Sequence, residues 1–179
     1  MMIQRKIANL IEKRIFGEPT VVILYGPRQA GKTTLITELL NKLNKEDIAA
    51  FNGDDLRTRD LFSTPSLDLL KNAVGDKKYL FIDEAQNIPN IGLSLKLLFD
   101  NLKIHIIVTG SASLDLANKL GEPMTGRSNA FTLYPVATGE KPWEFGGAET
   151  EANNRLKEFL RFGMYPKVLT TAGEDDKRQ

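Results

Sequence analysis

Two short stretches of the sequence combine residue types that bind and transfer phosphate groups. In the first, Gly26 to Thr33, every fixed position of the pattern G-x-x-x-x-G-K-[ST] is filled. Glycines let such a loop turn its backbone N–H groups toward an anion, and the helix that follows adds a positive dipole. Lys32 offers an ammonium to the β- and γ-phosphates, and the Thr33 hydroxyl is a ligand for Mg²⁺. The residues predicted to bind a nucleoside triphosphate, most simply ATP with Mg²⁺, are Gly26, Pro27, Arg28, Gln29, Ala30, Gly31, Lys32, Thr33 and Thr34.

The second stretch is the apolar run Tyr79–Ile82, which ends in two carboxylates, Asp83 and Glu84. An acidic residue at the tip of a buried strand can hold Mg²⁺ opposite the phosphate-binding loop, and we assign that role to Asp83, acting through water. Glu84 then points toward the γ-phosphate and orients or deprotonates the attacking water. A carboxylate at this position separates hydrolases from simple nucleotide binders, so the pair favours an enzyme.

Two further positions are candidates for catalysis, each with a plain structural alternative. Ser111, with Thr109 as the second choice, follows an apolar strand and could sense the γ-phosphate; alternatively its hydroxyl caps a helix that starts near Ser113. Arg127 could stabilise transition-state charge in its own or a neighbouring subunit, or could be an ordinary surface arginine. Arg28, inside the loop, faces either the nucleotide or a partner.

The elements that must position these residues follow from apolar periodicity. Short apolar runs alternate with segments of helical spacing, which indicates right-handed βαβ units and a parallel sheet covered by helices on both faces. Ligands of such sheets bind at the carboxyl ends of the strands, where every polar motif above falls. The predicted strands are 21–25, 48–51, 79–82, 104–109 and 131–134, and the predicted helices are 2–15, 33–43, one after Pro65, 91–102 and 151–162.

Composition limits the classes that remain. The 179 residues suffice for one domain with its own core, and 41% hydrophobic against 26% charged residues are ordinary globular values. No apolar run approaches the roughly 20 residues of a membrane span, and no cysteine is present, so a cytoplasmic protein without a membrane segment is expected. The net charge of +1 supports no global nucleic-acid surface. The basic residues near the N-terminus are interpreted as a solvated helix face rather than a binding surface; they are Arg5, Lys6, Lys13 and Arg14.

Taken together, the motifs resemble the bacterial and archaeal AAA-type ATPase family. The resemblance rests on Gly26–Leu35, Tyr79–Gln86 and Val108–Ser113, and is extended by Met124–Arg127 and the Gly-Met-Tyr-Pro segment at 163–166. It covers about residues 20–169, and the stretch 137–151 departs from it. It implies an AAA-like core, a three-layer P-loop fold with a five-stranded parallel sheet of order 5-1-4-3-2. Longer members of the family carry a C-terminal domain of unknown function.

The expected organisation is an N-terminal amphipathic helix at 1–18, a P-loop ATPase domain at 19–170 and a flexible tail at 171–179. The leading hypothesis is Mg²⁺-dependent hydrolysis of ATP that powers or gates a protein partner or a C-terminal domain, with oligomerisation left open. One alternative is a nucleotide-gated binding module with little hydrolysis. A phosphotransferase with a small-molecule acceptor is a third, although no arginine-rich lid segment is visible.

Overall fold

The computed structural model describes residues 3–111, 120, 124–140 and 149–171 of the chain. The strands are β1 (Val21–Tyr25), β2 (Ile48–Asn52), β3 (Tyr79–Asp83), β4 (His105–Gly110) and β5 (Ser128–Thr132). The α-helices are α1 (Ala8–Ile15), α2 (Lys32–Leu40), α3 (Leu56–Ser63), α4 (Leu67–Val74), α5 (Ile91–Leu102), α7 (Glu149–Phe162) and α8 (Pro166–Thr170). Short 3-10 turns are η1 (Lys45–Asp47), η2 (Ala85–Asn87) and η3 (Thr138–Glu140).

The five strands form one parallel sheet in the order β2-β3-β4-β1-β5. Read from the other edge, this is the order 5-1-4-3-2, so the predicted topology is confirmed. β4 lies between β1 and β3, with Ile23 of β1 opposite Val108 of β4. The strand tip that carries Ser111 therefore lies between the tips that carry the phosphate-binding loop and Asp83.

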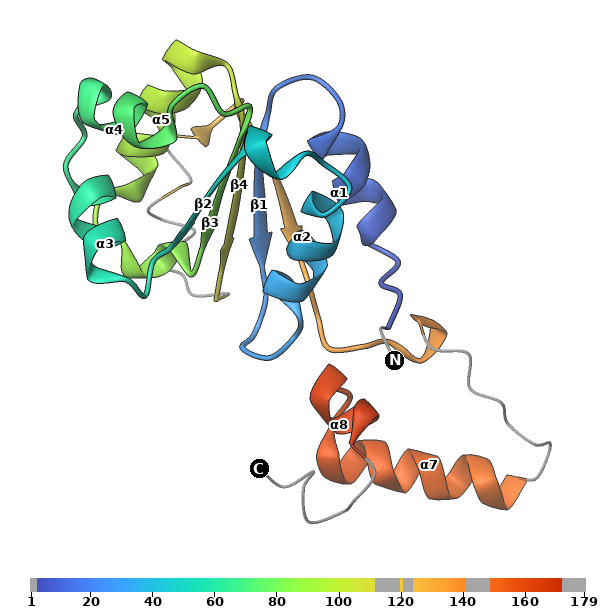
Figure 1. Cartoon of the computed structure of the whole chain (residues 1–179). Coiled ribbons are helices and arrows are strands. Elements are labelled where there is room, and N and C mark those ends of the chain that lie inside the picture. The colour runs from blue at the N-terminus through green and yellow to red at the C-terminus, as the bar shows by residue number, and fades with distance from the viewer. Residues whose placement is uncertain (1–2, 112–119, 121–123, 141–148, 172–179) are drawn as a thin grey trace.

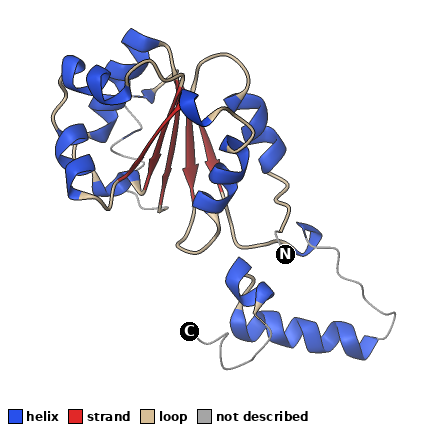
Figure 2. Cartoon of the chain, viewed as in Figure 1, coloured by secondary structure: helices blue, strands red, loops and turns tan. Residues whose placement is uncertain are grey.

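Helices cover both faces of the sheet (Figure 2). The strands bury side chains on each side. Because successive side chains of a strand point to opposite faces, Val21 and Ile23 join the core on the side of α3, α4 and α5. Val22 and Leu24 join the second core, under α1 and α2. Both clusters consist of buried apolar side chains, so the sheet is anchored on both faces. The phosphate-binding loop follows β1 at the carboxyl end of the sheet (Figure 1).

Two predicted elements have clearly different bounds in the structure, and helix α3 was absent from the prediction. The first helix begins at Ala8 and not at residue 2, because the segment before it is tied to other parts of the chain by Arg5. Strand β5 covers Ser128–Thr132 and not 131–134, since Val21 of β1 already pairs with Ser128. Helix α3 was not predicted, because its apolar periodicity is only moderate. Its N-cap is Asp55, whose side chain accepts a hydrogen bond from the backbone N–H of Arg57.

The last described helices lie beyond the carboxyl ends of the strands, on the side where β1 continues into the phosphate-binding loop (Figure 1). Helix α8 starts at Pro166, and a Cβ added to Gly31 would lie 3.7 Å from the Cγ of this proline. The backbone N–H of Val136 also donates to the carbonyl of Met164 at 2.8 Å. Among the described helices none is long and apolar enough to cross a bilayer.

Candidate active site

The phosphate-binding loop joins β1 to α2, and its two motif glycines are needed for different reasons. A Cβ on Gly26 would lie 2.3 Å from the carbonyl oxygen of Leu133, so the chain after β5 passes too close for any side chain. Gly31 has φ 93°, in the left-handed region that residues with a Cβ rarely adopt. Sequence pattern and geometry therefore agree on where this loop turns into the helix.

Lys32 lies at the start of α2 and folds back along the loop. Its Nζ donates to the carbonyl oxygens of Gly26 at 2.9 Å and Pro27 at 3.0 Å. Burial lowers the pKa of Lys32 below its ordinary 10.5, and the nearby carboxylates of Glu84 and Asp83 offset part of that shift. An ammonium that has lost much of its water, surrounded by loop backbone, is well placed to exchange a carbonyl for a phosphate oxygen.

Asp83, the last residue of β3, lies at the centre of the polar contacts. Its Oδ2 accepts from the Thr33 hydroxyl at 2.8 Å, and its Oδ1 accepts a short hydrogen bond from the Thr109 hydroxyl. Asp83 and Thr109 are both buried. Thus the first turn of α2 and the ends of β3 and β4 meet at Asp83, which lies 50 positions after Thr33 in the chain.

A hydroxyl and a carboxylate side by side form the hard oxygen donor set that suits Mg²⁺. In the described part of the chain no three His, Cys, Asp or Glu side chains cluster as a metal cage would require. Any Mg²⁺ at Thr33 and Asp83 would therefore take its remaining ligands from phosphate oxygens and water, as Mg²⁺ does in nucleotide sites.

Glu84 follows directly and has a strained backbone, with φ 50° and ψ 42°. Its Oε2 accepts from the Nε2 of Gln86 at 2.5 Å, and the Oε1 of Gln86 accepts from the backbone N–H of Ser111 at 3.2 Å. The predicted base and the predicted sensor are thus joined through one amide side chain. Gln86 was not assigned a role from the sequence, although it ends the motif Tyr79–Gln86.

The other predicted loop residues differ in their surroundings. Ala30 is buried, Pro27 is half-buried, and Arg28 and Gln29 are exposed at the turn. Thr34 is exposed on the first turn of α2 and lines a small hollow with Ile3, Leu35, Glu38 and Pro166. The same hollow is lined by Arg5, Ala30 and Gly31, so it adjoins the phosphate-binding loop.

Arg127 is the predicted site residue that the structure does not bring to the others within one chain. It precedes β5, at the amino ends of the strands, where its carbonyl accepts from the N–H of Val21. Its guanidinium forms a two-pronged ion pair with Asp100 of α5, at 2.8 and 3.2 Å. The hydrogen bond from Arg127 also lowers the pKa of Asp100. A role for Arg127 at the site of a neighbouring subunit stays a prediction.

We expect Arg127→Ala to leave ATP turnover per chain within about twofold of wild type in dilute solution, because an exposed ion pair contributes little. Asp100→Asn is the matched control, since it removes the same ion pair and keeps the arginine. Turnover measured against protein concentration checks both. A loss in Arg127→Ala but not in Asp100→Asn, seen only where chains associate, would instead place Arg127 in a second subunit's site.

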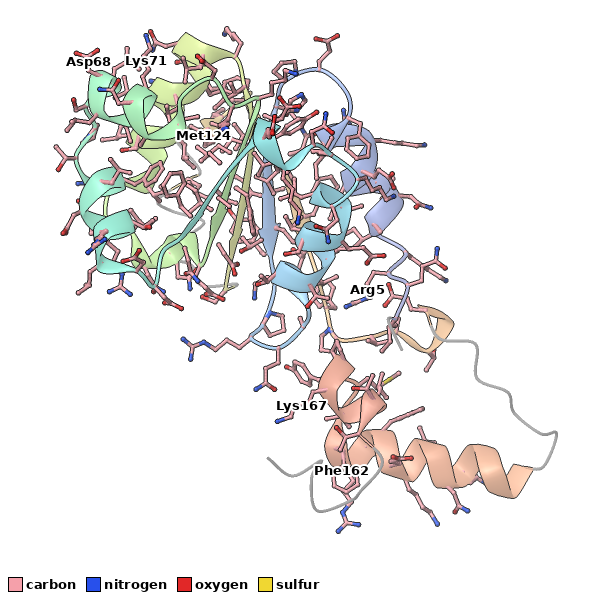
Figure 3. All side chains as sticks on the ribbon, in the orientation of Figure 1. Arg5, Asp68, Lys71, Met124, Phe162 and Lys167 are labelled. Carbon is pink, nitrogen blue, oxygen red and sulfur yellow. The ribbon has the colours of Figure 1, made fainter. Side chains whose placement is uncertain are left out.

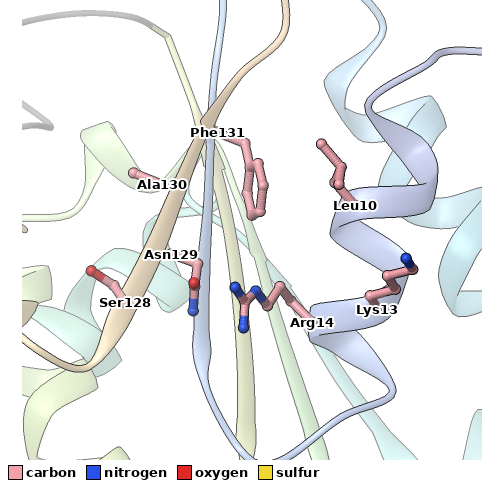
Figure 4. Close-up of a pocket in the computed structure, with 7 residues that line it drawn as sticks. All are labelled: Leu10, Lys13, Arg14, Ser128, Asn129, Ala130 and Phe131. Atoms are coloured by element: carbon pink, nitrogen blue, oxygen red, sulfur yellow. The ribbon is translucent and has the colours of Figure 1, made fainter.

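The basic N-terminal residues divide into two groups. Lys6, Lys13 and Arg14 are exposed, as predicted for a solvated helix face. Lys13 and Arg14 line a hollow of about 620 Å³ between α1 and β5 that contains none of the predicted site residues (Figure 4). Arg5 contradicts the prediction, because it is buried and its Nη1 donates to the carbonyl of Ala30 in the phosphate-binding loop at 2.9 Å.

Comparison with known proteins assigns this arrangement to a family. The family model described as "AAA domain" matches residues 18–141, more than half of the sequence and the whole sheet. The chain belongs to the AAA domain family. The predicted family is confirmed, and the core of this AAA domain is of the nucleotide-binding, ATPase-like kind.

Several relatives resemble most of this AAA domain. An uncharacterized protein of Mycobacterium tuberculosis is 31% identical over 177 residues, covering 98% of this chain and 36% of the relative. One from Methanocaldococcus jannaschii is 28% identical over 170 residues, covering 89% of this chain and 38% of the relative. A protein of the same archaeon named as ATP-binding is 30% identical over 108 residues, covering 57% and 29%. The AAA domain therefore spans less than two-fifths of the length of these relatives.

A solved structure of Pif1 helicases on forked double-stranded DNA has a similar fold. The TM-score is 0.50 at 14% sequence identity, and the match covers 98% of this chain and 50% of the helicase. At this identity the likeness concerns the fold alone. It agrees with a three-layer α/β P-loop architecture, which the parallel sheet and its flanking helices form.

Proposed function

We propose that the chain binds ATP with Mg²⁺ and hydrolyses the β-γ phosphoanhydride bond. The observation that carries this proposal is the 2.8 Å contact between the Thr33 hydroxyl and Asp83, with Glu84 as the next residue. This contact brings together Thr33 as the metal ligand from the loop and Asp83 as a second metal ligand. Glu84, the candidate base, is the next residue. A loop that only bound phosphate would not need a carboxylate pair at the tip of β3, two strands away from β1.

In this proposal each side chain has one task. The amides of Gly26–Thr33 and the Lys32 ammonium hold the phosphates, and Thr33 and Asp83 hold Mg²⁺, which supplies charge neutralisation at the β- and γ-oxygens. Glu84 accepts a proton from the attacking water or orients it, so that the water oxygen bonds to phosphorus as the bond to ADP breaks. Ser111, at the tip of β4 between the two motifs, contacts the γ-phosphate.

We assign ATP rather than GTP because the tetrapeptide that resembles a guanine-reading element lies at the wrong end of the sheet. Residues 44–47 read Asn-Lys-Glu-Asp, a tetrapeptide like the one that reads guanine in GTP-binding proteins, but they precede β2. That position is at the amino ends of the strands, across the sheet from the loop, so this tetrapeptide cannot contact a base bound there.

The second candidate function is a nucleotide-gated binding module with slow hydrolysis. It is favoured by the 2.5 Å hydrogen bond from Gln86 to Glu84, because that bond occupies one oxygen of the carboxylate proposed as the base. In either case the nucleotide would serve a protein partner or a C-terminal domain. We favour hydrolysis because a carboxylate accepts several hydrogen bonds, so the bond from Gln86 leaves Glu84 able to contact water.

Phosphate release from ATP, measured with Mg²⁺ and again with excess chelator, tests the proposal. We expect turnover that requires the metal and that GTP does not support at the same concentration. Measuring ATP affinity in parallel separates the alternatives. Tight binding with no metal-dependent release would favour the binding module, and failure to bind ATP at millimolar concentration would contradict both.

A further inference from the structure

Arg5 joins three segments of the chain that are far apart in sequence. Its guanidinium donates to the carbonyl of Ala30 in the phosphate-binding loop at 2.9 Å, to the carbonyl of Tyr134, and to Glu140 at 3.1 Å. We call Arg5, Glu140 and these two carbonyls the Arg5 clasp. Figure 3 labels Arg5 on the N-terminal segment, at the edge of the molecule where the loop lies.

The clasp is buried and specific. The side chains of Arg5 and Glu140 are only 7% and 8% exposed. Glu140 also accepts from the backbone N–H groups of Lys6 at 2.8 Å and Ala137 at 3.0 Å. A planar fork with fixed donor directions can satisfy three acceptors at once, whereas a lysine ammonium on a flexible stem cannot reproduce that pattern.

The side chain of Glu140 is an ionised carboxylate at neutral pH. Burial opposes its charge, but the hydrogen bonds from Ala137 and Lys6 and the charge of Arg5 outweigh that effect and lower the pKa of Glu140 below its ordinary 4.5. A carboxyl whose pKa is lowered on folding contributes its full stabilisation at pH values above its pKa in the unfolded state. It loses that contribution as the pH falls through its pKa in the folded state. The clasp is therefore intact throughout the neutral range.

The contact with Ala30 has a consequence for the amide that follows. The Ala30–Gly31 peptide bond is trans, so its C=O and its N–H point in opposite directions. Because Arg5 holds the carbonyl of Ala30, the N–H of Gly31 points to the opposite side of this peptide, away from Arg5. That N–H is one of the loop amides that an anion can use, and Gly31, at φ 93°, has the freedom to rotate away.

We infer that Arg5 is a positioning residue for the nucleotide phosphates: it fixes the Ala30–Gly31 peptide so that the loop is ready to bind before the nucleotide arrives. This inference rests on the proposed nucleotide binding but not on hydrolysis. Its effect is not a simple attraction between charges, because Glu140 neutralises Arg5. Without the contacts of Arg5, the loop would become ordered only when the nucleotide binds. The entropy lost in that ordering would lower the affinity for the nucleotide.

ATP affinity of the full chain, measured with Mg²⁺ by isothermal titration calorimetry, tests the role of Arg5. We expect both Arg5→Lys and Arg5→Ala to bind ATP about tenfold more weakly than wild type, since alanine has no donor and the compact lysine ammonium does not match acceptors placed around a planar fork. Arg14→Ala is the matched control: an arginine on the same N-terminal region, exposed and without an ion pair among the described residues. It should bind as wild type does.

Two further measurements decide between explanations. Urea unfolding of each variant separates a loss of fold from a loss of binding, and Arg5→Lys is the variant to rely on if Arg5→Ala does not fold. Glu140→Gln, which leaves Arg5 unneutralised, should bind no tighter than wild type. Wild-type affinity in folded Arg5→Lys, or tighter binding by Glu140→Gln, would overturn the inference. If the wild type bound ATP without hydrolysing it, the proposed ATPase activity would be contradicted but the role of Arg5 in binding would not. If the wild type did not bind ATP at all, both the proposed function and the role of Arg5 would be overturned.

Discussion

Glu84→Gln should keep ATP affinity near the wild-type value while lowering the turnover number by about 10²- to 10⁴-fold, the usual contribution of a general base. The reason is geometric and chemical. The amide keeps the size of the side chain and can still hydrogen-bond Gln86, but it has no carboxylate to accept a proton from water. Steady-state phosphate release together with equilibrium binding measures the two effects separately.

A matched control is Glu46→Gln, the same change at an exposed position next to β2 and outside the site. It should alter neither quantity. Gln86→Ala adds a second comparison, since it frees Glu84 from its 2.5 Å hydrogen bond without touching the carboxylate. If Glu84→Gln turned over ATP at the wild-type rate, Glu84 could not be the base, and water activation would have to be assigned elsewhere.

Lys32→Met should weaken ATP binding by roughly 10- to 100-fold, the range expected when a charged hydrogen bond to a phosphate is lost. Methionine retains the aliphatic stem but removes the ammonium that contacts the carbonyls of Gly26 and Pro27 at 2.9 and 3.0 Å. The variant thus loses both the charge offered to the phosphates and two bonds that shape the loop. Calorimetric titration with ATP provides the measurement.

Lys45→Met is the control for that experiment, because Lys45 is exposed on η1, at the amino end of β2. It should bind ATP like the wild type, with the same enthalpy. Equal ATP affinities for Lys32→Met and wild type would contradict the assignment of Gly26–Thr33 as the phosphate site, even if the fold were unchanged.

The features that sequence predicted best are those with strong local signals. The loop at Gly26–Thr33 is a contiguous motif, and the buried strands are short apolar runs, so the sheet could be placed without any tertiary information. The strand order came only from the resemblance to AAA-type ATPases, because apolar runs do not encode which strand neighbours which. The placing of Asp83 opposite the loop, where it meets Thr33, was predicted from the acidic residue at the tip of a buried strand.

The features that sequence missed depend on partners far away in the chain. Arg5 looked like one more cation of an amphipathic segment, and nothing local shows that Ala30 and Glu140 accept its hydrogen bonds. Arg127 follows Thr125-Gly126, as a catalytic arginine could, but strand β5 places it at the far end of the sheet beside Asp100. In both cases the role of the arginine depends on which distant groups its long side chain contacts, and the residue type alone does not specify those groups.

The position of Arg5 bears on how this protein is shortened or fused for study. Trimming the N-terminus to the first helix, starting at Ala8, would keep both buried apolar residues of α1, Ile11 and Ile15. That shortened domain would lack the side chain that holds Ala30, and its nucleotide affinity would underestimate that of the full chain. The functional boundary of the unit therefore lies upstream of its first helix, and a tag joined directly to that segment carries the same risk.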